Sequence, residues 1–281
     1  MHSGLRMMTR VTSIGFVLAL ACGDAAQAVE QRIWLAGWGE TGEGGPAAQP
    51  FIPEGAALDY LPPGFTVLPG RKMYVLSQSG DRDTGTIAPA APPEEEVSCG
   101  PRIGFTKPLN ITPDQLYLAS TDPISVAAAK EIPKTDPRLA KGIAAYLGGK
   151  GVAKPKVTIA RALEADLDGD GKPEAIVEAI TKGRGVAEFY EQERPGDFSF
   201  VAVGALSDAG FEVGGHAGYI FGFDKEHSVA AQFGIQALPD FTGNGHFDLA
   251  VAQAGYEWMS IDVYAWSAGA LKPIASAYCG V

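Results

Sequence analysis

Short, largely apolar runs bounded by turn-forming residues recur along the chain, and this pattern predicts β-strands rather than long helices. In the N-terminal half, such runs at Arg32–Ala36, Lys72–Ser77 and Leu116–Ser120 are separated by stretches rich in glycine and proline. Near the C-terminus, Trp258 to Trp266 forms a longer alternating run. We therefore expect a mainly β protein in which short strands are joined by turns.

One segment has the start and stop residues of a helix instead. Asp136 has the side chain of an N-cap, and Pro137 suits the first helical position. Gly148 follows Leu147 and is the residue type that commonly ends a helix. The sequence thus predicts one short helix near residues 137–147.

An internal repeat begins after residue 156. Glu164–Ile180 aligns with Leu238–Ala254 at an offset of 74 residues, and the same offset carries Tyr190 onto Tyr264. Each copy is expected to form a strand, an acidic loop, a second strand, a hairpin and a third strand. Repetition at this scale favours a repeat-built β-sheet architecture, in which each unit buries its apolar face against a neighbour.

The first 28 residues have the composition of an export signal. Arg6 and Arg10 make a positive start, Val11–Ala21 is an apolar core, and Ala26-Gln27-Ala28 is a small-x-small cleavage pattern. The apolar run is about half as long as a membrane span requires. We expect cleavage after this pattern and export, either to the periplasm or as a secreted protein. Cys22 leaves a lipid-anchored alternative open, although the residues before it are in the wrong order for a lipoprotein cleavage box.

The chain carries 22 Lys and Arg against 33 Asp and Glu, a formal net charge of −11. An acidic surface repels phosphate backbones, which argues against nucleic acid as a partner. The 36 glycines and 20 prolines agree with a fold of strands and turns. The expected organisation is a signal peptide at 1–28, a Pro/Gly-rich β region containing the helix at 29–156, and two repeats at 157–281, with no membrane span.

Two cysteines, Cys99 and Cys279, remain once the signal peptide with Cys22 is removed. In an exported protein this count favours one disulfide between them. Such a bridge would join the middle of the chain to its last residues and restrict the unfolded state. Two separate buried thiols are the alternative.

The acidic loop of the first repeat has carboxylates at alternating positions: Asp166, Asp168, Asp170 and then Glu174. Carboxylates spaced in this way can turn inward around one hard cation, and Ca²⁺ takes about six to eight oxygen ligands. Gly171 permits the sharp turn, and Lys172 would contribute only its backbone carbonyl. Because four carboxylates this close repel one another without a cation, we predict a Ca²⁺ site. A solvated acidic turn is the alternative.

The spacing distinguishes two kinds of calcium loop. An EF-hand needs a Glu at the twelfth loop position, but that position is Val177, inside an apolar run. Here Glu174 leads directly into Ala175-Ile176-Val177, which we expect to be a buried strand. The form Asp-x-Asp-x-Asp-Gly-x-x-Glu followed by a strand resembles the FG-GAP repeat, also described as the VCBS-type or integrin-alpha-like calcium repeat. The resemblance covers Val157–Ala277.

In that family the repeats are blades of a β-propeller, and calcium lies in the loop between adjacent strands. The resemblance therefore implies a partial β-propeller-like architecture, since two copies are visible in this sequence. It also implies a binding or adhesion-type module more than an enzyme.

The second repeat departs from the acidic pattern. Its ligand positions are occupied by Asp240, Thr242, Asn244, His246 and Asp248. Thr242 and Asn244 stand where the first loop has acids, and fewer charged ligands lower calcium affinity. We expect a weaker Ca²⁺ site in this loop, with a metal-free turn of the same shape as the alternative.

Enzyme motifs are weak in this chain. Gly37-x-Gly39-x-x-Gly42 matches a dinucleotide-binding string, but the residues after it cannot open a helix. Asp83-Thr84-Gly85 spells an aspartic-protease triplet, yet it follows polar residues rather than an apolar strand, so we expect a polar hairpin turn. No Gly-x-Ser-x-Gly nucleophile motif occurs. A hydrolase site would have to use scattered groups such as Asp81, Asp83 and His216.

Aromatic residues gather near the C-terminus, at Tyr256, Trp258, Tyr264 and Trp266. We expect them to pack mainly in the core, while exposed rings would suit a contact with a protein or glycan.

Together, these patterns favour an exported, calcium-binding, repeat-based binding or adhesion module, with a protein or a glycan as its partner. A cell-envelope inhibitor or immunity-type protein, which would block a basic partner with its acidic surface, is one alternative. A secreted hydrolase is the other.

Overall fold

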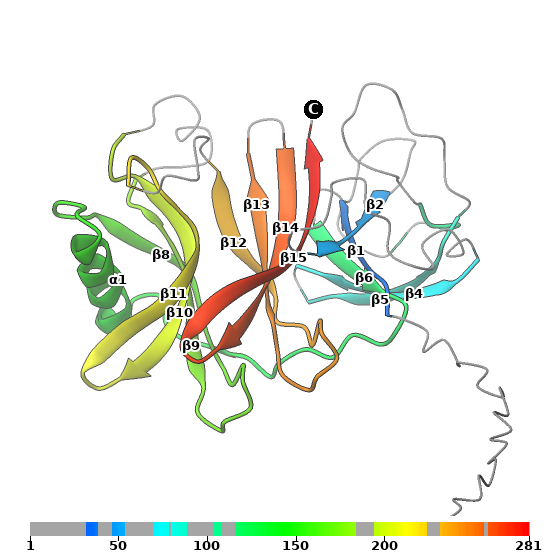
Figure 1. The fold of residues 1–281 in the computed structure, drawn as a ribbon, viewed down its shortest axis with the longest axis horizontal. Helices are drawn as coiled ribbons and strands as arrows, with labels where there is room; N and C mark the ends of the chain where they lie inside the picture. The colour runs from blue at the N-terminus through cyan, green and yellow to red at the C-terminus, as the bar shows by residue number, and fades with distance from the viewer. Residues whose placement is uncertain are drawn as a thin grey trace, which may run out of the picture. The chain divides into compact units, whose positions relative to one another are not determined.

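The computed structural model describes residues 32–38, 47–53, 70–78, 80–88, 104–107, 109, 116–183, 194–223, 231–255 and 258–280 (Figure 1). These residues form three five-stranded antiparallel sheets and one helix, so the predicted mainly β fold with one short helix is confirmed. The described strands close into neither a barrel nor a complete propeller. The predicted signal peptide, with Cys22, lies outside the described residues.

The N-terminal sheet has the strand order β2-β1-β6-β4-β5. Its strands are β1 (Trp34–Trp38), β2 (Ala47–Pro50), β4 (Lys72–Ser77), β5 (Arg82–Thr86) and β6 (Leu116–Ser120). The strands expected at Lys72–Ser77 and Leu116–Ser120 have the predicted bounds, and the first strand begins two residues later than Arg32.

The hairpin turn expected at Asp83-Thr84-Gly85 is wrong, because these residues belong to strand β5. Asp83 pairs with Val75 in the β4–β5 ladder, and the chain reverses earlier, where Gly80 has a left-handed backbone (φ 90°). Strand β5 lies at the edge of its sheet, and its side chains alternate between exposed and half-buried. An edge strand tolerates this polar sequence because one of its sides faces water.

The other two sheets are each built around a four-stranded meander. The first meander sheet has the order β11-β10-β9-β8-β7, with β7 (Lys130–Glu131), β8 (Val157–Ala165), β9 (Glu174–Thr181), β10 (Phe198–Ser207) and β11 (Gly210–Ile220). The second meander sheet has the order β12-β13-β14-β15-β3, with β12 (Gln232–Ala237), β13 (Leu249–Ala254), β14 (Trp258–Ser267), β15 (Ala270–Gly280) and β3 (Ile52–Pro53). Two short strands from the N-terminal region, β3 and β7, thus complete the edges of sheets formed by the C-terminal region.

The two meanders have matching irregularities. The β10–β11 ladder shifts register between Val203 and Gly204, and the β14–β15 ladder shifts between Val263 and Tyr264, which are 60 positions further on. At the acidic loops, corresponding residues of the two meanders are 74 positions apart. The first meander therefore has 14 more residues than the second between its acidic loop and its register shift. Tyr190, expected to match Tyr264, lies outside the described residues.

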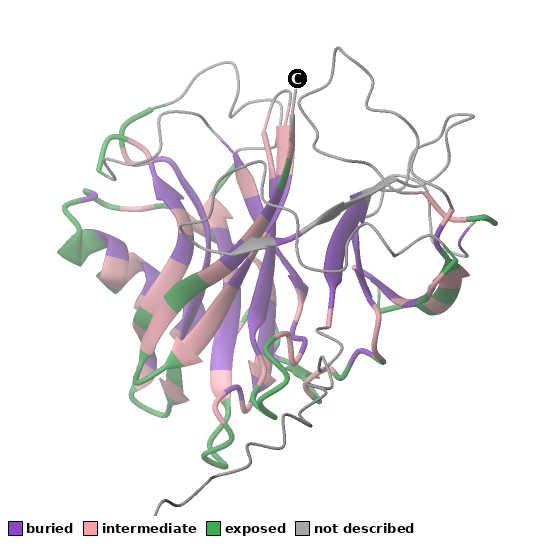
Figure 2. Ribbon diagram, turned by 45° about the vertical axis from the view of Figure 1, so that its right-hand side comes forward, coloured by how far each residue is buried: buried purple, intermediate pink, exposed green. Residues whose placement is uncertain are grey.

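The apolar cores lie between the sheets as layers. Val201 and Tyr219 of the first meander sheet pack with Phe233 and Val251 of the second. The other face of the second meander sheet packs against the N-terminal sheet, in a cluster that includes Trp34. The second meander sheet is therefore buried on both faces. Figure 2 shows buried residues running along the strands of the meander sheets.

The helix α1 (Pro137–Gly149) covers the outer face of the first meander sheet (Figure 1). Asp136 is its N-cap and accepts the Arg138 backbone N–H at 2.9 Å, as predicted. The helix ends two residues later than the predicted Leu147, since the first left-handed glycine is Gly151 (φ 101°) and not Gly148. Within the described part of the chain, no helix has the length and apolar character needed to span a membrane.

Candidate metal centre

The first acidic loop joins β8 to β9 and is shaped by two glycines. Gly169 and Gly171 have left-handed backbones, with φ of 75° and 83°. Residues with a Cβ adopt this conformation only at a cost, so glycine allows the tight double turn that this loop requires. Glu174 begins β9, and the predicted buried strand Ala175-Ile176-Val177 is confirmed.

Three carboxylates of this loop converge. Asp166, Asp168 and Glu174 each place an oxygen so that these atoms lie within 4.8 Å of one another. Backbone N–H groups hold the arrangement: those of Gly169 and Gly171 donate to the two oxygens of Asp166 at 2.8 and 3.0 Å. The Leu167 N–H donates to Glu174 Oε2 at 2.9 Å and ties the start of the loop to its end. The loop is thus organised around its acids.

Asp170 and Lys172 lie outside the group of three carboxylates. Asp170 Oδ1 accepts the Lys172 backbone N–H at 2.7 Å, and the Lys172 Nζ lies 3.8 Å from Asp170 Oδ2. The lysine side chain is largely exposed. Of the predicted ligands in this loop, the structure therefore brings together Asp166, Asp168 and Glu174.

The surroundings of Glu174 disfavour its charged form in the absence of a cation. Burial raises the pKa of Glu174, the Leu167 N–H lowers it, and the like charge of Asp168 raises it again. A divalent cation among these oxygens would reverse this balance, because it attracts the charges that otherwise repel.

The second acidic loop joins β12 to β13 and repeats the backbone of the first. Gly243 and Gly245 have φ of 75° and 84°, close to the values of their counterparts 74 positions earlier. The Gly245 N–H donates to Asp240 Oδ2 at 3.3 Å, as Gly171 donates to Asp166. The Phe241 N–H donates to Asp248 Oδ2 at 3.0 Å, as Leu167 donates to Glu174. The two loops thus share one hydrogen-bonding scheme despite their different charge.

One oxygen of the second loop is left without a partner. Asp240 Oδ1 is buried and accepts no hydrogen bond from any residue that the structure describes. Burial raises the pKa of Asp248, whose Oδ2 accepts the N–H groups of Phe241 and Thr242, and the Asp240 charge raises it further. A buried unpartnered carboxylate oxygen costs free energy, which a bound cation would relieve. The side chains of Thr242, Asn244 and His246 are exposed.

The two loops lie side by side. The Phe247 N–H donates to the Leu167 carbonyl at 2.8 Å, and the His246 ring lies against Gly169, 3.1 Å from where a Cβ would be. On its other side the second loop meets the N-terminal sheet. Arg32 Nη1 donates to the Asp240 carbonyl at 2.9 Å, and Trp34 Nε1 donates to the Phe241 carbonyl at 3.0 Å.

Sequence reasoning missed Arg32 and Trp34 as partners of the second loop. Each of these contacts spans more than 200 positions along the chain, 208 for Arg32 and 207 for Trp34. No local pattern indicates a contact at that separation. The sequence signal for the Trp34 contact was limited to the burial that is expected of a tryptophan in an apolar run.

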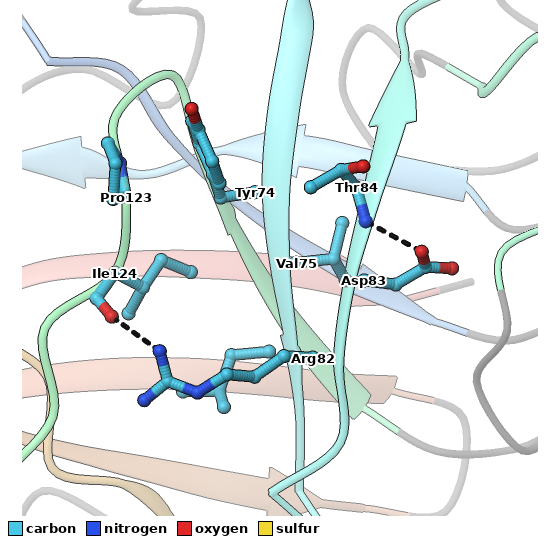
Figure 3. A pocket seen from close by; sticks show the side chains of 8 residues that line it. Tyr74, Val75, Arg82, Asp83, Thr84, Pro123 and Ile124 are labelled. Carbon is cyan, nitrogen blue, oxygen red and sulfur yellow. Dashed lines mark hydrogen bonds between the residues drawn. The ribbon is translucent and has the colours of Figure 1, made fainter.

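The scattered groups considered for a hydrolase are not assembled into one site. Asp83 lies on β5 beside a cavity of about 330 Å³, where its Oδ1 accepts the Thr84 N–H at 2.7 Å and Arg82 Nη1 donates to the Ile124 carbonyl at 3.0 Å (Figure 3). His216 lies on β11 of the first meander sheet, with its Nδ1 2.7 Å from the Tyr146 hydroxyl. The second meander sheet packs between the sheets that carry Asp83 and His216.

The remaining expectations concern the cysteines and the C-terminal aromatic residues. Cys279 lies on β15, and Cys99 lies outside the described residues, so their pairing stays a prediction. Trp258, Tyr264 and Trp266 are half-buried and pack against the core between the meander sheets, as expected. Tyr256 lies outside the described residues.

Comparisons with known protein families, with curated proteins and with solved structures find no match for this chain.

Proposed function

We propose that this chain is an exported, calcium-stabilised binding module whose two acidic loops are of the FG-GAP type. The observation that carries the proposal is the pair of adjacent loops with one backbone geometry, the first of which brings three carboxylates within 4.8 Å. Two adjacent loops with the same turns and the same hydrogen bonds are typical of a repeated structural unit.

The donor set suits a hard divalent cation. Carboxylate oxygens are the preferred ligands of Ca²⁺, and Asp166, Asp168 and Glu174 would hold the ion in the first loop, with Asp170 and the Lys172 carbonyl as further expected ligands. In the second loop, Asp240 and Asp248 would supply the charge, and the buried Asp240 Oδ1 has no hydrogen-bond partner among the described residues. Bound calcium would supply positive charge that ties each pair of strands together.

A structural role for calcium supports a binding module more than an enzyme. The loops connect β8 to β9 and β12 to β13, so a cation there would stiffen both meanders and the contact between them. The hydrolase alternative needs groups such as Asp83 and His216 to act together, and they lie in different sheets. The partner of the module is a protein or a glycan, since the acidic charge disfavours nucleic acid.

Calcium should raise the melting temperature of the purified chain, and EGTA should lower it. Binding at about 100-fold above Kd stabilises the folded state by about 2.7 kcal/mol, which corresponds to about 5–10 °C for a chain of this size. Asp168→Ala should remove most of this shift because it deletes one of the converging carboxylates. The measurement is a thermal melt followed by circular dichroism in calcium and in EGTA.

Asp208→Ala is the matched control, because it removes the same charge from an exposed hairpin position. It should leave the calcium shift intact. Melting curves that respond to neither calcium nor EGTA would contradict the metal assignment. A shift that survives in Asp168→Ala would place the ion elsewhere.

A pull-down from cell-envelope extract, run in calcium and in EGTA, tests the binding role. A partner retained only in calcium supports the module. Capture of a single cationic protein that is released by salt, with or without calcium, would favour the inhibitor alternative instead.

A further inference from the structure

A basic pocket lies at the end of the first meander sheet away from its acidic loop. The cavity has a volume of about 470 Å³, and four cationic residues are part of its lining: Lys154, Lys156, Lys182 and Arg194. The acidic loop follows the last residue of β8, whereas the pocket lies beside its first residue. Since β8 has nine residues at about 3.3 Å each, the two features are roughly 25–30 Å apart.

The fold brings these cations together from three separate segments. Lys154 and Lys156 follow the helix, and Lys182 follows β9. The Lys182 N–H donates to the Lys156 carbonyl at 2.8 Å, which places the two residues beside each other at the end of the β8–β9 ladder. Arg194 precedes the turn into β10. Lys154 has a left-handed backbone (φ 50°), which a residue with a Cβ adopts only at a free-energy cost.

Three of the cations in the lining, the lysines, are not neutralised by other described residues. Among the described residues, the side chains of Lys154, Lys156 and Lys182 take part in no hydrogen bond or ion pair, and all three residues are exposed. The one carboxylate in the lining, Asp197, is buried and accepts the Arg194 backbone N–H at 3.1 Å. In a chain with a net charge of −11, these three lysines around one cavity make a local site for an anion.

An aromatic ring lines the same cavity. Phe223 is 40% exposed and is one of two large apolar side chains that are exposed among the described residues. Its ring lies over Gly151, where a Cβ would be 3.2 Å from the Phe223 ring carbon Cε1. Gly151 therefore leaves room for the ring beside the lysines. An apolar ring next to cations matches a ligand that has both an apolar face and negative groups.

We propose that this pocket binds an acidic saccharide, in which a sugar ring packs on Phe223 and its sulfate, phosphate or carboxylate groups contact the lysines. The cavity is within the size range of small-ligand sites, roughly 300–1,000 Å³. The flexible side chains of the lysines allow their ammonium groups to reach anionic groups at different positions on the saccharide. This site is separate from the calcium loops, so it holds or fails independently of the calcium assignment.

Isothermal titration of a heparin-derived tetrasaccharide into the full chain tests the proposal. We expect one site whose affinity falls as salt is raised, and no binding of neutral maltotetraose. The triple variant Lys154→Ala/Lys156→Ala/Lys182→Ala should raise the Kd by about tenfold or more, and Phe223→Ala by roughly three- to tenfold.

The matched control is Lys134→Ala/Lys141→Ala/Lys272→Ala, which removes the same charge from exposed positions outside the pocket. This control variant should change the Kd less than twofold. A twofold change is about 0.4 kcal/mol of binding free energy, which is the size of effect that surface substitutions commonly produce. Equal weakening by the two triple variants would show a general charge effect and overturn the proposal. Binding of inorganic sulfate as tight as that of the tetrasaccharide, with Phe223→Ala unchanged, would show an anion site without saccharide recognition and would overturn it as well.

Discussion

Glu178 is a half-buried carboxylate at the contact between the two meander sheets. It lies on the face of β9 that also carries Ile176 and Ile180 and that packs against the second meander sheet. Its Oε2 accepts the Ile235 N–H at 3.2 Å, and Gly234 leaves room beside that oxygen. Burial raises the pKa of Glu178, and the Ile235 N–H lowers it without cancelling the effect of burial. The folded state therefore favours the protonated acid more than the unfolded state does.

The sign of the resulting pH dependence follows from linkage. A carboxyl group whose pKa is raised by folding stabilises the folded state fully at pH values below its unfolded-state pKa of about 4.3. This stabilisation is lost as the pH rises through the folded-state pKa. Glu178→Gln keeps the shape without the charge. The free energy of unfolding of this variant, relative to the wild type, should therefore increase as pH rises above about 4.3. Urea titrations in EGTA between pH 4 and pH 8 measure the difference.

Glu212→Gln serves as the control, because Glu212 is exposed on β11. Its difference from the wild type should stay flat over the same pH range. If the Glu178→Gln difference is equally flat, burial does not control the ionisation of Glu178.

At the scale of elements, α1 and β11 approach so closely that one helical position must lack a side chain. A Cβ on Gly142 would lie 2.2 Å from the Phe211 carbonyl oxygen and 2.8 Å from the Phe211 Cβ. Gly148, in the last turn of the same helix, has open space around its Cβ position. The two glycines thus separate the effect of packing from that of helix propensity.

Gly142→Ala should destabilise the protein by about 1–3 kcal/mol, because the added methyl forces the helix away from β11. Gly148→Ala should stabilise it by about 0.5–1 kcal/mol, since alanine is the better helix former and meets no obstacle. Chemical denaturation of both variants gives the comparison. Two changes of the same sign would show that the contact between α1 and β11 is looser than described.

At the scale of the whole molecule, Trp34 joins the N-terminal sheet to the second acidic loop. Its ring stacks on Phe241 with centroids 4.9 Å apart, and its indole N–H donates to the Phe241 carbonyl. Trp34 is 5% exposed, so both the ring and the hydrogen bond are shielded from water. This contact links the N-terminal region to a repeat that begins about 200 positions later along the chain.

Trp34→Phe should cost about 1–2 kcal/mol, because it keeps an aromatic ring and leaves the Phe241 carbonyl without its donor. Trp34→Ala should cost about 3–5 kcal/mol, because it also empties the space that the ring fills. Free energies of unfolding from urea titrations test both values. If the two variants are equally destabilised, the ring contact contributes little and the hydrogen bond dominates.

Local patterns were sufficient wherever a feature depends on neighbouring residues. The short apolar runs Lys72–Ser77 and Leu116–Ser120 predicted strands at their observed bounds, and Asp136 with Pro137 predicted the start of α1. The acidic spacing predicted a loop in which four carboxylates converge. Asp166, Asp168 and Glu174 do converge, and Asp170 lies outside the group. Such features are set by side-chain direction, capping and glycine conformations, which act over a few residues.

The errors came from features that depend on position within a sheet or on the path of the chain. Asp83-Thr84-Gly85 has a turn-like composition, but its place at the edge of the N-terminal sheet makes it a strand. Gly148 has the residue type of a helix terminator, yet the helix continues until Gly151 takes the left-handed conformation. The residues Asp83-Thr84-Gly85 are compatible with a turn or a strand, and pairing with β4 selects the strand.

The sequence by itself determined the mainly β class, the single helix and the acidic loop with its turns, because periodicity and local geometry encode them. Only the tertiary structure decided that the two acidic loops lie side by side, that Arg32 and Trp34 support the second loop, and that three lysines and an arginine meet around one cavity. These are contacts between residues distant along the chain. They exist because strand pairing and sheet stacking bring those segments together, and no short-range pattern records that outcome.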